Sequence, residues 1–418
     1  MNRRSFIKNT GVAALAEGTL PFHSFKLPSE DKRYNYHGRT SDYKDFRIIE
    51  KGLKISKIET FSKDSIGLVK ISTDSGNEAW GQISTYDASI TAMILHRRVA
   101  HHFLGQDPAK IDDLCDRCIE SNHKFPWSYV SRALAGVDSA IWDLYGKIKG
   151  KPVVELLGGR ARPQLVYGSS MRRDISPEDE AKRIFELQQS DGYKAFKIRI
   201  GSEQGRNQDA SPGRTEKIVP LIRKVIGWDT GLLVDANSCY TPDKAIEIGR
   251  MLEQQNVIQF EEPCPWWEME WTKEVTDALD VPVSGGEQDN DMGQWRRIIK
   301  TKAVDIIQPD PLYLGGITRT LRVAKMAEEA GLTCVPHSAN HGLVTIFSLH
   351  LLGAIPNALK YMEYSIEFDA DLNKEANSMY EPHLKVVDGA VQVTAEPGWG
   401  VHIKKEWIKN ADYHKSEV

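Results

Sequence analysis

The chain has 418 residues, of which 40% are hydrophobic and 27% charged, a balance that suits a soluble globular protein of two domains. The net charge is only −4, without a long basic or acidic run, so nucleic acid and anionic membrane surfaces are poor candidate partners. Five cysteines make no disulfide framework in a chain this long. No run of 18 apolar residues predicts a membrane-spanning helix.

The first residues resemble a twin-arginine export signal. Arg3 and Arg4 precede a short apolar run over residues 11–16, which Glu17 ends early. We therefore expect a periplasmic or exported protein, with a cytoplasmic protein that has a basic start as the alternative. Residues 1–45 are predicted to be this signal and a polar linker.

Residues 46–160 predict an α+β domain. Residues 54–61 and 66–72 alternate or are rich in β-branched side chains, a turn follows over 74–77, and the chain returns over 79–81. Apolar residues then recur at helical spacing between about 87 and 148. This pattern is typical of an antiparallel meander followed by helices.

From residue 161 to about 380 the pattern alternates between strand and helix. Ser176 and Thr241 each precede a proline at the start of a predicted helix, and Ser176 is the expected N-cap of the first. Strands are predicted at 166–167, 195–200, 231–235, 257–260, 281–286, 303–307, 332–335 and 359–362. Alternating units of this kind indicate parallel strands with crossover helices, and eight of them in about 200 residues fit a closed barrel.

Three acids follow successive predicted strands at equal spacing. Asp235, Glu261 and Glu287 are separated by 26 residues each. The carboxyl ends of parallel barrel strands meet at one mouth, so these side chains should converge. Three carboxylates without cysteine or histidine favour a hard cation, which predicts a Mg²⁺ site and leaves Mn²⁺ open.

Other ionisable residues stand at the remaining strand ends. Lys197 and Arg199 alternate with apolar residues, so both should face the barrel interior. Asp310 and His337 end neighbouring strands, where a carboxylate can orient an imidazole and raise its basicity. Glu363 follows the last predicted strand.

These residues and their surroundings resemble the enolase superfamily, in particular its mandelate racemase/muconate lactonizing enzyme group. The resemblance covers residues 46 to 403. Its motifs lie at 74–81, 138–147, 156–159, 234–237, 260–263, 285–287, 308–310, 315–318 and 336–337. It implies a modified (β/α)₇β TIM barrel of the α/β class over residues 161–380, an N-terminal α+β capping domain over 46–160, and a C-terminal segment, 381–418, that completes the cap.

The resemblance also implies roles for these residues. Asp235, Glu261 and Glu287 would be the metal ligands, Asp310 and His337 the base dyad, and Glu363 a donor toward the substrate carboxylate. The family usually has Lys-x-Lys on the second strand, where the second lysine is a base, but this chain has Lys197 and Arg199. Arginine is not deprotonated near neutral pH and cannot easily be a base.

The expected chemistry is Mg²⁺-assisted removal of the proton next to a carboxylate by His337, followed by dehydration of a sugar acid to a 2-keto-3-deoxy acid. Racemisation, epimerisation or cycloisomerisation with Lys197 as base is the alternative. A non-catalytic, metal-containing protein that binds carboxylates or sugars is an alternative of another class. The expected partner is a small carboxylate substrate, and the chain is expected to form a homo-oligomer. Asn237, Arg206 and Arg214 are candidate substrate-binding residues.

Overall fold

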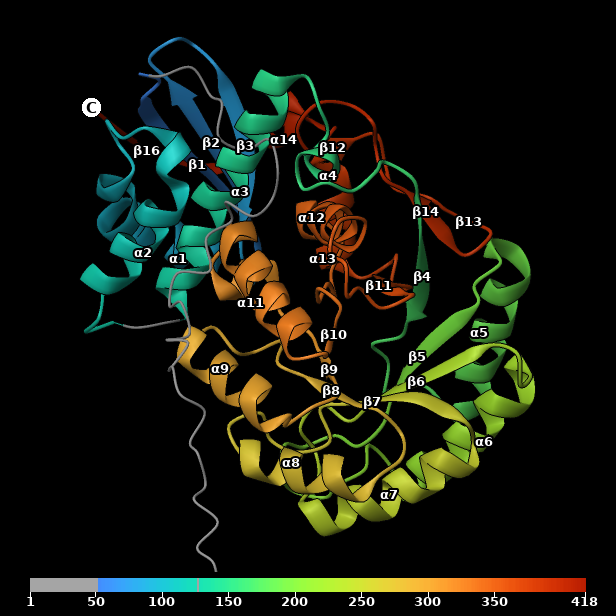
Figure 1. Cartoon of the computed structure of the whole chain (residues 1–418). Helices are drawn as coiled ribbons and strands as arrows, with labels where there is room; N and C mark the ends of the chain where they lie inside the picture. The colour runs from blue at the N-terminus through green and yellow to red at the C-terminus, as the bar shows by residue number, and fades with distance from the viewer. Residues whose placement is uncertain (1–51, 126–127) are drawn as a thin grey trace, which may run out of the picture. The chain divides into compact units, whose positions relative to one another are not determined.

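The computed structural model describes residues 52–125 and 128–418 (Figure 1). The predicted export signal lies outside these residues, so export stays a prediction. Among the described residues, no helix combines the length and apolar character needed to cross a membrane.

The N-terminal cap is a four-stranded antiparallel sheet covered by helices. Its first three strands form a meander, and the fourth comes from the C-terminus of the chain and pairs with β1. The strands are β1 (Ile55–Lys63), β2 (Ile66–Thr73), β3 (Glu78–Ile83) and β16 (Asp412–Glu417). The helices are α1 (Ala88–Ile94), α2 (Ile111–Ser121) and α3 (Tyr129–Lys149), with short π and 3₁₀ segments at Leu95–Val99, Ala100–His102 and Pro108–Lys110.

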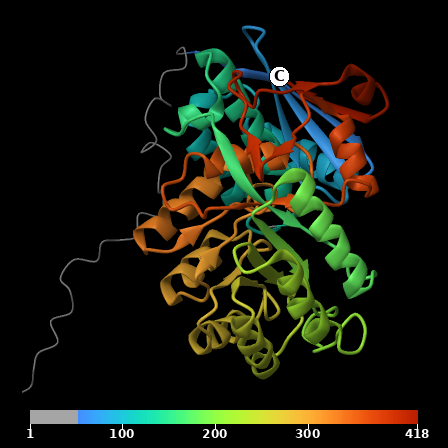
Figure 2. The same ribbon diagram turned by 90° about the vertical axis from the view of Figure 1, so that its right-hand side faces the viewer.

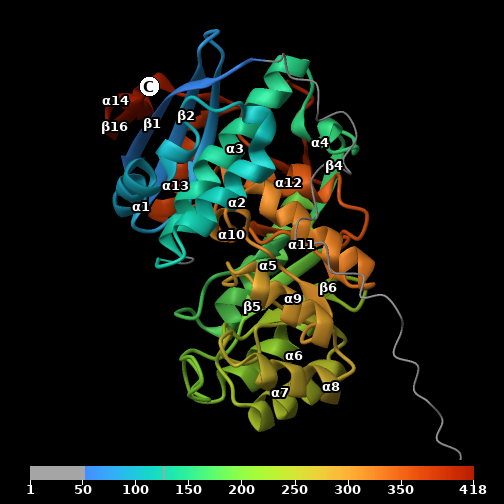
Figure 3. The same ribbon diagram turned by 60° about the vertical axis from the view of Figure 1, so that its left-hand side comes forward.

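Helix α3 packs directly on β3 because glycines stand at their crossing (Figure 3). A Cβ added at Gly81 would lie 2.3 Å from the carbonyl oxygen of Gly136 and 2.6 Å from the amide nitrogen of Ala140. A Cβ at Gly136 would in turn meet Val69 and Ile83. Because Gly81 and Gly136 carry no side chains, the backbones of the helix and the sheet come into contact here.

The short helix α4 (Val153–Leu156) leads into the barrel. Within the described ranges, eight parallel strands follow one another around it, and at least one helix lies between each strand and the next (Figures 1 and 2). The strands are β4 (Pro163–Ser169), β5 (Ala195–Arg199), β6 (Gly231–Asp235), β7 (Val257–Glu261), β8 (Val283–Gly285), β9 (Ile306–Ile307), β10 (Thr333–Cys334) and β11 (Met362–Ser365). The helices are α5 (Pro177–Asp191), α6 (Arg214–Ile226), α7 (Pro242–Gln254), α8 (Met269–Ala278), α9 (Met292–Thr301), α10 (Pro311–Leu314), α11 (Ile317–Glu329) and α12 (Leu343–Leu352).

The barrel closes through two contacts. Strand β11 pairs in parallel with β4, and a parallel bridge joins Cys334 of β10 to Ala358, just before β11. This confirms the predicted (β/α)₇β barrel with its α+β cap. The last strand was predicted too early, at 359–362, because residues 357–359 also bond to β10 as an irregular extension. Glu363 therefore lies within β11, and not after it.

The C-terminal segment adds strands to both the barrel sheet and the cap sheet. The hairpin of β13 (Val386–Val387) and β14 (Ala390–Gln392) pairs with the beginning of β4, while β16 joins the cap sheet. Helix α13 (Asp371–Ser378), strands β12 (Tyr380–Glu381) and β15 (His402–Ile403), and helix α14 (Lys405–Lys409) connect these pieces. The cap core includes Leu312, Ile317 and Val344 from the barrel helices, so cap and barrel share buried apolar surface.

Candidate active site

The three evenly spaced acids lie side by side at the carboxyl ends of adjacent strands. Backbone pairing places Arg199 beside Asp235 and Asp235 beside Glu261, and Glu287 follows β8, the next strand in the sheet. All three carboxylates are buried. The parallel register therefore assembles the predicted cluster of acids at the mouth of the barrel.

Lys197 lies among these acids, fully buried. Its Nζ is 2.6 Å from Oε1 of Glu261, 2.7 Å from Oε1 of Glu363 and 3.7 Å from Oδ2 of Asp235. Burial alone would lower the pKa of Lys197, but Glu261 and Glu363 outweigh it and raise the pKa above its usual value. Lys197 is thus a charged group between carboxylates.

Arg199 faces the same interior. Its Nη1 contacts Oδ2 of Asp235 and donates to Oδ1 of Asn237 over 2.8 Å, while its Nε donates to the carbonyl oxygen of Ser170. Asn237 also donates its backbone N–H to Oδ1 of Asp235, over 2.6 Å. Arg199 and Asn237 therefore hold Asp235 from two sides.

Asp310 and His337 form the predicted pair. Nδ1 of His337 is 2.8 Å from Oδ2 of Asp310, whose Oδ1 accepts the backbone N–H groups of Leu312 and Tyr313 at the start of α10. Burial would lower the pKa of His337, but Glu287, Asp310 and Glu363 raise it to about 10. The carboxylate thus fixes the orientation of the ring.

The other ring nitrogen of His337 faces the acids. Nε2 lies 3.1 Å from Oε2 of Glu287 and 3.4 Å from Oε2 of Glu363. These distances suit ion pairs, yet the angles make no hydrogen bond, and Nε2 has no hydrogen-bond partner among the described residues. Nε2 is therefore free to exchange a proton with a molecule held between these groups.

The carboxylates of the predicted metal ligands suit a divalent cation, although in this structure they face positively charged side chains of the protein. As they stand, no three acidic, histidine or cysteine side chains in residues 52–125 and 128–418 enclose a metal ion. Glu262 and Glu363 are also buried here, so the carboxylates outnumber Lys197 and Arg199. The pKa of Glu262 lies well above its usual value through burial and through Glu287 and Glu261. This excess of buried negative charge and the hard oxygen donors fit Mg²⁺.

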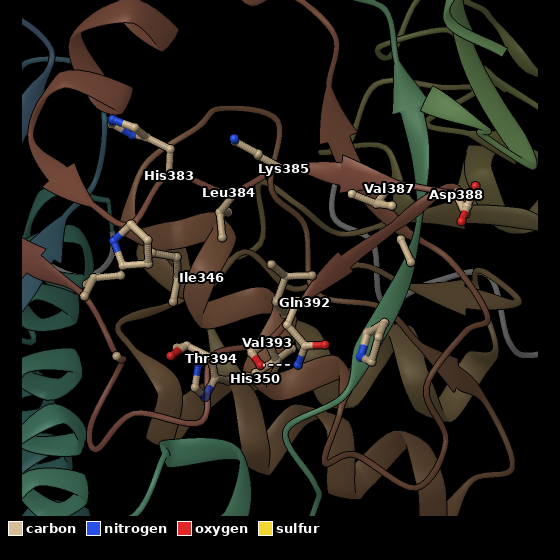
Figure 4. Close-up of a pocket in the computed structure, with 16 residues that line it drawn as sticks. Ile346, His350, His383, Leu384, Lys385, Val387, Asp388, Gln392, Val393 and Thr394 are labelled. Carbon is tan, nitrogen blue, oxygen red and sulfur yellow. Dashed lines mark hydrogen bonds between the residues drawn. The ribbon is translucent and has the colours of Figure 1, made fainter. Parts of the chain in front are cut away.

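A cavity of about 490 Å³ opens over this cluster. Its lining includes Tyr86, Arg132, Arg173, Asn237, Glu287 and His337. A larger cavity, about 700 Å³, lies between α12 and the C-terminal segment and is lined mainly by apolar side chains, Ile346, Leu384 and Val393 among them (Figure 4). We assign the chemistry to the smaller cavity, because the larger one is lined by none of the strand-end acids.

The two arginines expected to bind substrate lie elsewhere. Arg206 is exposed on the loop after β5 and does not line the cavity. Arg214 is buried at the start of α6, where its guanidinium donates to the backbone carbonyl oxygens of Arg199 and Arg172. The sequence of a long polar loop does not determine where its side chains point. The sequence alone therefore could not show that both arginines lie away from the cavity.

Arg132 and Arg173 line the cavity in their place. Arg173 follows β4, the one barrel strand whose predicted end carries no acidic or basic residue. Arg132 lies near the start of a cap helix, and no local pattern sets it apart.

Models of two protein families match the chain. The N-terminal domain of mandelate racemase and muconate lactonizing enzyme matches residues 46–158, and the enolase C-terminal domain-like family matches residues 179–407. Together they span the cap and most of the barrel.

Individual relatives agree with these matches. The arabinonate dehydratase of Saccharolobus solfataricus is 28% identical over 80% of this chain and 87% of its own length. A crystal structure of a racemase candidate from Roseobacter denitrificans is 54% identical, with a TM-score of 0.86 over 87% of this chain and 100% of that one. A mandelate racemase/muconate lactonizing protein from Paracoccus denitrificans, complexed with magnesium, is 26% identical, with a TM-score of 0.80 over 87% of this chain and 98% of that one.

Proposed function

The chain belongs to the mandelate racemase/muconate lactonizing enzyme group of the enolase superfamily and is an enzyme, and on this premise we propose that it dehydrates a sugar acid to a 2-keto-3-deoxy acid. One observation carries the choice of reaction. The oriented base His337 faces the acids from one side, whereas the position of the family's second base is occupied by Arg199, which is held by Asp235 and Asn237. One effective base suits elimination better than inversion.

The proton moves through His337. In its neutral form, His337 takes the proton from the carbon next to the substrate carboxylate on Nε2, while Asp310 holds Nδ1–H and stabilises the imidazolium that forms. Lys197 supplies positive charge beside the carboxylate on which negative charge develops. Mg²⁺, held by Asp235, Glu261 and Glu287, would supply further stabilisation of that charge when bound.

Elimination completes the reaction. The bond from the neighbouring carbon to its hydroxyl oxygen breaks, and the leaving hydroxide takes the proton from the His337 imidazolium to become water. The enol that remains tautomerises to the 2-keto-3-deoxy acid. The net change is the loss of one water molecule, and His337 returns to its starting state.

Racemisation or epimerisation is the second candidate, since Lys197 and His337 approach opposite oxygens of Glu363, at 2.7 and 3.4 Å. This reaction needs two bases, so Lys197, which is charged between the carboxylates, would have to give up its proton first. The relative from Roseobacter denitrificans, 54% identical, is named as a racemase candidate, which supports this second candidate.

The test is a screen of mono- and dicarboxylic sugar acids with Mg²⁺ present, in which a carbonyl reagent detects the keto acid. We expect keto acid from at least one sugar acid and a loss of about 10²- to 10⁴-fold in kcat for His337→Asn. Turnover that survives this substitution would show that His337 is not the base.

The same screen in D₂O separates the two reactions. Dehydration gives keto acid, whereas racemisation gives recovered substrate that carries deuterium with inverted configuration and no keto acid. If no acid of the panel reacts or exchanges its proton, the proposed dehydration is contradicted and the alternative of a binding protein gains support.

A further inference from the structure

Arg132 brings a positive charge from the cap into the active-site cavity. It lies on α3, half-buried, and lines the cavity together with His337. It forms no ion pair with any described residue, and the one hydrogen bond of its side chain there runs from Nη1 to the hydroxyl of Ser84. The nearby acid Asp87 accepts instead from the hydroxyl of Tyr129, over 2.9 Å.

The position of Arg132 is fixed by an aromatic ring. Its Cζ lies 3.7 Å from the centre of the Tyr313 ring, and that ring lies 6.3 Å from the ring of His337. A guanidinium this close packs its face on the ring, which leaves its edge free for a planar bidentate partner such as a carboxylate. The guanidinium, of which only Nη1 is engaged, is therefore one aromatic ring away from the base.

A second arginine of the cavity has no ion pair among the described residues, but its side chain already donates hydrogen bonds to neutral groups. Arg173 donates to Oδ1 of Asn237 and to the backbone carbonyl oxygens of Ile200 and Gly201, over 2.7, 3.2 and 2.8 Å. It sits on the β5–β6 side, next to Arg199, whereas Arg132 sits over the β9 side of the mouth, on Tyr313. Of the three arginines that line the cavity, Arg132 thus has the most unused donors, and it stands away from the floor where the reacting carboxylate would bind.

A partly buried cation with unused donors costs free energy until an anion meets it. We propose that Arg132 binds a second carboxylate, at the far end of the substrate from the reacting carbon, and that the enzyme acts on dicarboxylic sugar acids in preference to monocarboxylic ones. This inference rests on the proposed dehydratase function and names its substrate class. Arg132 is a specificity residue that touches the substrate and moves no proton.

The experiment compares hexaric acids with the hexonic acids of the same configuration, which differ only in the terminal group. For the wild-type enzyme we expect kcat/KM to be about 10- to 100-fold higher for the diacid, the effect of one charge-assisted bidentate contact. Arg132→Gln should remove this preference by raising KM for the diacid, with kcat/KM for the monoacid changed less than about 3-fold.

Two further variants sharpen the comparison. Arg132→Lys keeps the charge and loses the planar fork, so it should recover part of the preference. Arg98→Gln is the matched control, because Arg98 is another cap arginine over an aromatic ring, 4.6 Å from the centre of Phe125, but it does not line the cavity. It should leave both substrates unchanged.

The outcomes separate this inference from the function it rests on. Equal turnover of diacid and monoacid by the wild type, or an equal loss for both in Arg132→Gln, would overturn the role of Arg132 and leave the dehydratase intact. No turnover of any sugar acid would overturn the dehydratase function itself. Calorimetric titration of a hexaric acid into His337→Asn, with and without Arg132→Gln, measures the contact without chemistry, and equal affinities would also contradict the inference.

Discussion

Asp310 uses its two oxygens for two different tasks. Oδ2 orients His337, and Oδ1 caps the first turn of α10 by accepting the N–H groups of Leu312 and Tyr313. The same turn carries the Tyr313 ring on which Arg132 packs. One carboxylate therefore links the base to the wall of the cavity.

Asp310→Asn separates these tasks. The amide oxygen can still accept the two backbone N–H groups, so α10 should stay folded, but the amide nitrogen would donate to Nδ1 of His337 and leave the proton on Nε2. A ring in this tautomer cannot take the substrate proton, so we expect kcat to fall about 10²- to 10⁴-fold with little change in KM.

Steady-state kinetics on the best sugar acid, with circular dichroism as the check on folding, measure this effect. A well-folded Asp310→Asn protein with unchanged kcat would mean that the orientation of the ring does not depend on Asp310.

At the scale of elements, the cap depends on one close crossing. Helix α3 carries Arg132 near its start and packs on β3 where Gly81 faces Gly136. A displacement of α3 from the sheet would therefore move the substrate-facing arginine as well. Packing of the cap and geometry of the cavity are coupled through this helix.

Gly81→Ala tests that coupling. The added methyl group would lie 2.3 to 2.6 Å from backbone atoms of α3, which cannot rotate away, so the helix must shift. Overpacking of this kind costs about 1–3 kcal/mol. We expect a lower midpoint of thermal unfolding and a higher KM for substrates that reach Arg132.

Gly285→Ala is the control for stability, since its Cβ would meet only ordinary contacts, the nearest at 3.7 Å. Equal midpoints for the two variants would show that α3 and β3 are not in tight contact.

For the whole molecule, the sequence is informative where the structure repeats. Asp235 and Glu261 end predicted parallel strands, and register alone brings them together, so the cluster of acids could be foreseen. Arg132 could not, because its place in the cavity depends on how the cap packs on the barrel, which no local pattern encodes. For the same reason the sequence did not show that β14 pairs with β4 while β16 pairs with β1.

His350 joins three segments that are far apart in the chain. It lies fully buried on α12, its Nδ1 accepts the backbone N–H of Val154 over 3.0 Å, and its ring meets the ring of Trp399 edge-on at 5.2 Å. Burial lowers the pKa of His350 to about 3. The histidine is therefore neutral in the folded protein at every pH where the protein is expected to work.

This burial makes the assembled molecule sensitive to acid. An unfolded chain binds the proton near pH 6.5 and the folded one only near pH 3, so the contribution of His350 is complete above pH 6.5 and declines by about 1.4 kcal/mol per pH unit below it. His350→Asn keeps an acceptor for Val154 and cannot titrate. We expect it to be less stable than wild type at pH 7, with the difference in free energy of unfolding reduced by about 3 kcal/mol at pH 4.

Urea unfolding from pH 7 to 4 measures this difference, with the exposed His123→Asn as control for the loss of a histidine. Parallel curves for wild type and His350→Asn would show that His350 takes up its proton equally well in both states.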